Sequence, residues 1–320
     1  MRIAKGKKFD GRPGARLSRA MAGGAALAAL GAVLGAPGVA RADEQVLILL
    51  DRTGSMRAPS TTTPGVTRMD VAKARISNFM NTVPPGGVPR VWSFWTFDTD
   101  PTTGAPLVEN LVDFDDGKTP ADIEAVLSTI TPRGNTPLAM ASCAALTELI
   151  TFRPDDPDDT KQLFLVTDMG ENFTPPIDEC FGPFSTAPLP TPPDPAVWSN
   201  GSWQWKVINK AVTGFPNVDY DANDDGVLDV VAPGTEIVVN AVQLFDAPVS
   251  LAPRAASFEA LAIGALASVE QDVEFLRSLT ALTGGRYEGI TQLSSFAEFA
   301  APAGDANRSG CVDLGDLLFV

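Results

Sequence analysis

Gln45-Val-Leu-Ile-Leu-Leu-Asp-Arg-Thr-Gly-Ser55 is the stretch that decides the fold. Its five consecutive aliphatic residues, 46–50, predict a strand that is buried on both faces, as the strands of parallel sheets are. The run ends at Asp51, and two hydroxyl residues, Thr53 and Ser55, follow at alternate positions. In parallel sheets, ligands bind beyond the carboxyl ends of the strands, so we expect a binding site in this loop.

Strand-like and helix-like segments alternate along the rest of the chain. Runs rich in aliphatic and aromatic residues predict strands at residues 46–50, 91–97, 163–167 and 236–244, and a last short strand is predicted to begin at 286–288, after Gly284-Gly285. Helical spacing predicts helices at 68–83, 119–130, 136–150, 273–283 and 293–299. Thr119 and Thr136 each precede a proline, so each is predicted to be a helix N-cap. This alternation predicts an α/β fold, a doubly wound and mostly parallel sheet with helices on both faces.

Residues 172–234 interrupt this pattern with proline-rich stretches and three tryptophans, Trp198, Trp203 and Trp205. We interpret them as an irregular insertion that packs around a helix at residues 205–212, above the binding edge of the sheet. The tryptophans are then candidates for a specificity surface. Residues 301–304 have the small-residue and proline composition of a linker to a C-terminal tail at 301–320.

The first 42 residues have the pattern of a secretory signal: a basic start, a small apolar run at 21–35, and Ala40-Arg41-Ala42 before the predicted cleavage point. A membrane anchor is the alternative, but the apolar run is short and rich in glycine. We therefore predict a domain over residues 43–300 that is secreted, periplasmic or held at the cell surface, without a membrane span after cleavage.

The chain carries a net charge of −15 and contains no histidine. Removing residues 1–42, with their eight Lys or Arg and one Asp, would bring the net charge to −22. This acidity argues against nucleic acid and anionic membrane as partners. The lack of histidine excludes Ser-His-Asp catalysis and the usual zinc sites, so oxygen-bound Mg²⁺, Mn²⁺ or Ca²⁺ are the candidate metals.

Three cysteines are present, and an exported protein can form a disulfide. We favour the pair Cys143 and Cys180, which leaves Cys311 unpaired.

Three separated segments carry the candidate site: Asp51-Arg-Thr-Gly-Ser55, Gly134-Asn-Thr-Pro137 and Thr167-Asp-Met-Gly-Glu-Asn172. Together they resemble the von Willebrand factor type A family with its metal-ion-dependent adhesion site. Residues 275–287 also resemble the last long helix and the following strand of that family. The resemblance covers roughly residues 45–299, apart from 172–234.

The resemblance implies a metal site made of Asp51, Thr53, Ser55, Thr136 and Asp168. Thr53 and Ser55 would bind the ion directly, Thr136 conditionally, and the two aspartates directly or through water. Two carboxylates about neutralise a divalent cation, and hydroxyls add oxygen ligands without charge. An acidic group of a protein or carbohydrate partner could then replace a water on the ion. The implied function is metal-dependent binding or adhesion, without enzymatic activity.

Two other functions compete with this interpretation. Asp51-Arg-Thr-Gly-Ser also resembles a phosphatase-type loop in which Asp51 would be the nucleophile, assisted by Mg²⁺. Thr53 stands where soluble enzymes of that kind have a second Asp, and the chain lacks the membrane helices of phosphate-transferring pumps. The other alternative is a calcium-stabilised structural or surface-assembly component.

Two acidic loops have the ligand spacing of EF-hand-type calcium sites. The first has Asp221, Asn223, Asp225 and Asp229 at positions 1, 3, 5 and 9, but Ala232 at position 12. The second has Asp305, Asn307, Ser309, Asp313 and Asp316 at positions 1, 3, 5, 9 and 12. It resembles the first half of a dockerin, which makes a cohesin a candidate partner and Ca²⁺ a candidate ligand of both loops.

Overall fold

The computed structural model describes residues 43–60, 63–154, 159–168, 170–185, 198–219, 237–244 and 259–289. The chain divides into two units, Met1–Ala40 and Arg41–Val320, and all described residues belong to the second. The predicted signal segment, both acidic loops, Cys311 and the predicted helix at 293–299 lie outside the described residues. Within the described part, no helix is both long and apolar enough to cross a membrane.

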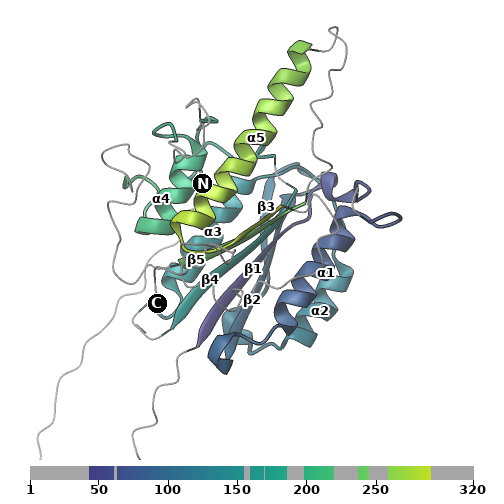
Figure 1. Ribbon diagram of the computed structural model, residues 1–320, viewed down its shortest axis with the longest axis vertical. Coiled ribbons are helices and arrows are strands. Elements are labelled where there is room, and N and C mark those ends of the chain that lie inside the picture. The colour runs from purple at the N-terminus through teal and green to yellow at the C-terminus, as the bar shows by residue number, and fades with distance from the viewer. Residues whose placement is uncertain are drawn as a thin grey trace, which may run out of the picture. The chain divides into compact units, whose positions relative to one another are not determined.

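Six strands form one sheet in the order β3-β2-β1-β4-β5-β6 (Figure 1). They are β1 (Glu44–Asp51), β2 (Arg90–Thr99), β3 (Pro106–Val112), β4 (Thr160–Thr167), β5 (Ile237–Gln243) and β6 (Tyr287–Gly289). All neighbouring strands are parallel except β2 and β3, which are antiparallel. The predicted α/β class with a mostly parallel sheet is therefore confirmed.

Helices cover both faces of the sheet (Figure 1). They are α1 (Arg68–Asn81), α2 (Pro120–Thr129), α3 (Leu138–Thr151), α4 (Trp203–Thr213) and α5 (Glu259–Leu282), with short 3₁₀ helices η1 (Gly54–Arg57), η2 (Pro85–Gly87) and η3 (Phe114–Asp116). Side chains alternate along β1, so Val46, Ile48 and Leu50 pack with α1 and α2. Leu47 and Leu49 pack with α3, α4 and α5 on the other face.

The two predicted threonine caps have different outcomes. Thr119 caps α2 as predicted, because its side chain accepts a hydrogen bond from the Asp122 N–H in a capping box. The predicted cap at Thr136 is wrong, because α3 begins at Leu138 and Pro137 occupies the cap position. The free N–H groups at this helix start are bound from another loop: Ala139 N donates to Glu171 (2.6 Å) and Met140 N to Thr174 (3.1 Å).

The structure also corrects the interpretation of the helix in the predicted insertion. α4 lies in the connection between the parallel strands β4 and β5, and it packs against α3 and α5. Such a crossover usually contains a helix that covers the sheet. The three tryptophans are core residues, since Trp198, Trp203 and Trp205 are 5%, 1% and 7% exposed. They therefore do not form an exposed specificity surface, although Trp203 is also part of the wall of a pocket described below.

Two elements depart from the predicted pattern. The edge strand β3 was not predicted, because its Glu109-Asn110 pair interrupts the aliphatic pattern. α5 begins at Glu259, earlier than the predicted residue 273, and ends at Leu282.

Candidate metal centre

The predicted site residues lie where the strand order reverses. Asp51 is the last residue of β1, Asp168 directly follows β4, and these two strands are neighbours at the centre of the sheet. The chain continues from β1 to β2 on one side and from β4 to β5 on the other. Reversal points of this kind leave a crevice at the carboxyl ends of the strands, where α/β proteins bind ligands.

Side chains from the two strand ends form one hydrogen-bonded set. The Thr53 and Ser55 hydroxyl oxygens are 3.0 Å apart, and Ser55 donates a hydrogen bond to Asp168 Oδ1 at 2.8 Å. Asp51 is held from both sides: Oδ1 accepts from Thr53 N at 2.8 Å and Oδ2 accepts from the Thr167 hydroxyl at 2.7 Å. Asp51 is fully buried, whereas Ser55 is exposed, so the set opens to solvent at Ser55.

Thr136 is brought to the same edge by backbone contacts. Gly54 N donates to Gly134 O (2.9 Å), which joins the β1 loop to the loop that precedes α3. Gly134 has a φ of +71°, and a Cβ there would lie 2.5 Å from the Thr99 hydroxyl, so only glycine fits. Thr136 itself exchanges two hydrogen bonds with Asn172. Among the described residues its hydroxyl has no hydrogen-bond partner, so it is available as a ligand.

The two carboxylates are buried close to each other at a high electrostatic cost. Burial, followed by the nearby charge of Asp168, raises the pKa of Asp51 from 3.8 to about 7. Burial also raises the pKa of Asp168, while hydrogen bonds from Arg68 and Ser55 oppose that rise. A cation between these side chains would favour the charged form of both, because opposite charge offsets the lost hydration.

Arg68 supplies one positive charge at this site. It is the first residue of α1, and its Nη1 lies 2.6 Å from Asp168 Oδ2. The other oxygen of that carboxylate, Oδ1, accepts from Ser55. The centre therefore has two carboxyl groups and one guanidinium, which leaves a surplus of one negative charge when both carboxyl groups are ionised.

Arg52, between Asp51 and Thr53, belongs to a second charged group on the other side of the loop. We call it the ion-pair network: Arg52, Asp98, Glu109 and Arg133. Asp98 is fully buried and pairs with Arg52 at 3.1 Å and with Arg133. Arg133 N also donates to Arg52 O at 2.6 Å. This network ties the β1 loop to β2, β3 and the loop that carries Thr136.

The donor set fits a hard divalent cation. Asp51, Asp168 and the three hydroxyls of Thr53, Ser55 and Thr136 offer oxygen only, which suits Mg²⁺ and related ions. No group of three or more His, Cys, Asp or Glu that could hold a metal occurs within the described ranges. Any cation at this edge would therefore depend on hydroxyl ligands.

The structure adds three side chains that the sequence patterns did not single out. Arg68 pairs with Asp168, Thr167 donates to Asp51, and Asn172 holds Thr136. Thr167 and Asn172 are the first and last residues of the segment 167–172 that carries Asp168, so their position in the sequence could have predicted a role at the site. Arg68 is separated from Asp168 by 100 residues, and nothing in its local sequence marks it.

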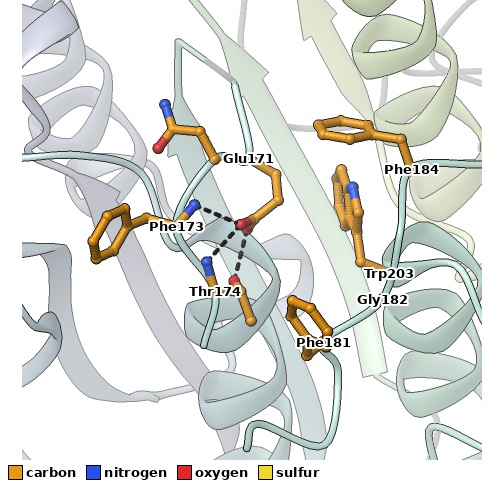
Figure 2. Close-up of a pocket in the computed structure, with 8 residues that line it drawn as sticks. Glu171, Phe173, Thr174, Phe181, Gly182, Phe184 and Trp203 are labelled. Carbon is orange, nitrogen blue, oxygen red and sulfur yellow. Dashed lines mark hydrogen bonds between the residues drawn. The ribbon is translucent and has the colours of Figure 1, made fainter. Parts of the chain in front are cut away.

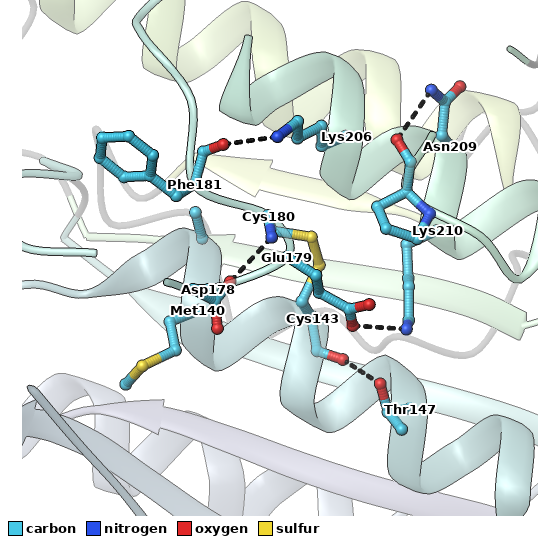
Figure 3. Close-up of a disulfide and its surroundings, with 12 residues drawn as sticks. Met140, Cys143, Thr147, Asp178, Glu179, Cys180, Phe181, Lys206, Asn209 and Lys210 are labelled. Carbon is cyan, nitrogen blue, oxygen red and sulfur yellow. Dashed lines mark hydrogen bonds and ion pairs between the residues drawn. A yellow bond between two sulfur atoms is a disulfide. The ribbon is translucent and has the colours of Figure 1, made fainter. Parts of the chain in front are cut away.

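Cys143 of α3 and Cys180 form a disulfide, with their Cα atoms 6.3 Å apart (Figure 3). It fastens the loop after β4 to the helix that follows Thr136.

Comparison with known proteins assigns no family. No family model matches the chain, and no curated protein matches it. Among solved structures, an aerotolerance-related membrane protein from Bacteroides fragilis is similar, with 14% identity over 77% of this chain and 91% of that chain and a TM-score of 0.39. A von Willebrand factor type A protein from Catenulispora acidiphila has 13% identity, coverages of 83% and 41%, and a TM-score of 0.39.

Proximal thread matrix protein 1 from the mussel byssus, with a zinc-occupied metal-ion-dependent adhesion site (MIDAS) motif, is also similar. It has 13% identity over 80% of this chain and 42% of that chain, and a TM-score of 0.37. Identities and TM-scores this low assign neither a function nor a ligand to this chain.

Proposed function

We propose that this protein binds Mg²⁺, or a similar divalent cation, at Asp51, Thr53, Ser55, Thr136 and Asp168, and uses the ion to bind an acidic group of a partner. The observation that carries the proposal is the continuous contact from Thr53 to Ser55 (3.0 Å) and from Ser55 to Asp168 (2.8 Å), which joins two strand ends. The predicted signal segment makes it a secreted, periplasmic or surface protein, and its partner is a protein or carbohydrate.

Charge and solvent access support a binding role for the ion. The surplus negative charge of the centre attracts a cation, and the buried carboxylates are stabilised by it. Ser55 is exposed, so one side of the ion would face solvent and keep water there. A partner carboxylate can replace such a water because hard cations prefer charged oxygen ligands.

The geometry favours binding over phosphoryl transfer to Asp51. A nucleophilic carboxylate needs an oxygen that can reach its substrate. Both oxygens of Asp51 accept hydrogen bonds, from Thr53 and Thr167, and the residue is fully buried. Asp51 is therefore better placed to orient ligands of the cation than to attack a phosphorus atom.

The test is calorimetric titration of the protein lacking residues 1–42 with Mg²⁺, Mn²⁺ and Ca²⁺. Asp51→Asn keeps the shape of the side chain and removes its charge, and we expect it to weaken metal binding by about a hundredfold or more. The matched control is Asp115→Asn, which removes an exposed carboxylate of η3 and should leave binding unchanged.

Equal metal binding by the wild type and Asp51→Asn would overturn the proposed site. That result would indicate that the cation binds at the acidic loops 221–229 and 305–316. It would favour the alternative function, a calcium-stabilised structural or assembly component. The dockerin-like tail and its cohesin partner stay predictions that a calcium titration of a 301–320 peptide can test.

A further inference from the structure

A small pocket opens beside the candidate metal centre. Its cavity volume is about 170 Å³, and it is lined by Glu171, Asn172, Phe173, Thr174, Phe181, Gly182, Phe184 and Trp203. In Figure 2, Phe181, Phe184 and Trp203 lie along one side, and Glu171, Phe173 and Thr174 along the other. Phe173, Phe181 and Phe184 are 39%, 39% and 41% exposed, which is high for phenylalanine.

The polar wall of this pocket is fixed by hydrogen bonds. Glu171 is 7% exposed, and its carboxylate accepts from Ala139 N, Phe173 N, Thr174 N and the Thr174 hydroxyl at 2.6 to 3.0 Å. These four donors occupy both oxygens. The wall therefore has little remaining capacity to accept hydrogen bonds from a ligand.

The aromatic wall of the pocket, formed by Phe181, Phe184 and Trp203, is also fixed by contacts with its surroundings. Lys206 of α4 donates to Phe181 O at 2.6 Å, next to the disulfide at Cys180 (Figure 3). A Cβ on Gly182 would lie 2.3 Å from Gly201 O, so this segment runs directly against the start of α4. Trp203 is 1% exposed and meets Phe184 edge to face, with centroids 5.9 Å apart. The exposed rings therefore belong to a preformed surface.

Asn172 joins the pocket to the metal centre. It lines the pocket, its Oδ1 accepts from Thr136 N at 3.0 Å, and its own N–H donates to Thr136 O at 3.1 Å. Glu171 is three positions after Asp168 in the sequence, which is a reach of about 10 Å at most along the chain. One extended peptide could thus occupy both places with side chains about three residues apart or fewer.

We propose that this pocket receives one aromatic side chain of a partner polypeptide, close in sequence to the Asp or Glu that binds the metal ion; this rests on the proposed function. A cavity of roughly 150 Å³ lined by apolar side chains holds one benzene ring, whereas drug-sized ligands occupy roughly 300 Å³ or more. The pocket thus matches a single ring. A sugar fits less well, because its hydroxyls need hydrogen-bond partners and both carboxylate oxygens of Glu171 are already occupied.

The first experiment measures the pocket without metal. We would titrate the protein lacking residues 1–42 with p-cresol in EDTA and follow binding by saturation-transfer NMR. Phe184→Ser should weaken this binding by about tenfold or more, because it removes one aromatic wall. Ile177→Ser is the matched control, since Ile177 is 95% exposed in the same loop and does not line the pocket. If p-cresol does not bind the wild type, the pocket proposal is wrong, whatever the metal centre does.

The second experiment adds Mg²⁺ and uses synthetic peptides. Each has one Asp in a Gly/Ser background and one Phe placed one, two or three residues to either side; the comparison peptides have Ala in place of Phe. At the best spacing we expect the Phe peptide to bind about tenfold tighter than its Ala counterpart, and Phe184→Ser to remove that advantage.

The outcomes separate the two proposals. Equal binding of Phe and Ala peptides at every spacing would overturn the aromatic subsite and leave the metal-dependent function standing. A Phe advantage that persists unchanged in EDTA and in Asp51→Asn would uphold the pocket and overturn the metal-dependent function. A urea unfolding transition like that of the wild type is the check that Phe184→Ser is folded.

Discussion

Two charged groups share the loop after β1, and they differ in charge balance. Asp51, Thr53 and Ser55 face Asp168 and Arg68, which gives two carboxylates against one guanidinium. The intervening Arg52 faces the other side, where two carboxylates meet two guanidiniums. The ion-pair network is therefore neutral by itself, whereas the candidate metal centre has a negative charge left over. The contrast indicates that surplus negative charge, together with hydroxyl oxygen ligands, distinguishes the candidate metal centre from a structural ion-pair cluster.

Removing one charge from the balanced network should have the largest effect on stability. Asp98→Asn leaves two guanidiniums, Arg52 and Arg133, with Glu109 as their one remaining carboxylate partner in the network. We therefore expect the free energy of unfolding to fall by about 3 kcal/mol. Metal affinity of the folded variant should change by about threefold or less, because Asp98 is not a proposed ligand. Urea unfolding and calorimetry measure the two quantities. If Asp98→Asn loses metal affinity but keeps its stability, the ion-pair network is not a purely structural group separate from the candidate metal centre.

Asp272 sharpens the comparison, because it is a buried carboxylate outside both groups. Burial, followed by the charge of Glu171, raises the pKa of Asp272 from 3.8 to about 7, and its Oδ1 has no hydrogen-bond partner in the described structure. The folded state therefore binds this proton more tightly than the unfolded state does. Its contribution makes stability fall as the pH rises from about 4 to about 7.

Asp272→Asn should remove that contribution. In EDTA, the stability of the variant relative to the wild type should increase between pH 5 and pH 8, by on the order of 2 kcal/mol. Urea unfolding of both proteins at the two pH values measures the difference, and the comparison cancels the pH dependence of other groups such as Asp51. A constant difference between pH 5 and pH 8 would mean that Asp272 does not titrate in this range.

The smallest effect should come from Arg68. Its guanidinium offsets part of the negative charge on Asp168 and repels an incoming cation. Arg68→Gln should therefore raise Mg²⁺ affinity by about fivefold, which is ~1 kcal/mol. Arg57→Gln, which removes an exposed cation of η1, is the control and should have a weaker effect that disappears at high salt. Lower affinity in Arg68→Gln would instead indicate that Arg68 orders the carboxylate for the ion.

The candidate site was predictable where its residues lie directly beside strand ends. Asp51, Thr53 and Ser55 share one loop, and Asp168 follows an aliphatic run. Thr136 was predicted to be both a site residue and a helix N-cap, because a Thr-Pro pair is typical of a helix start. The segment does lie at this edge of the sheet, but Thr136 does not cap α3. Its backbone is bound to Asn172 instead, and Glu171 and Thr174 bind the helix N–H groups. A local sequence pattern cannot show that side chains from another loop bind the N–H groups at the start of a helix.

The sequence by itself determined the α/β class, the buried central strands and the polar segments at their ends, because hydrophobic periodicity and hydroxyl-carboxylate spacing are local properties. Only the tertiary structure decided which charges meet. In the folded chain, Arg68 pairs with Asp168, and Arg52 pairs with Asp98. The three tryptophans lie in the core, whereas Phe173, Phe181 and Phe184 are partly exposed beside the candidate metal centre. Charge balance and side-chain exposure depend on which segments pack together, and that is set by the whole sheet.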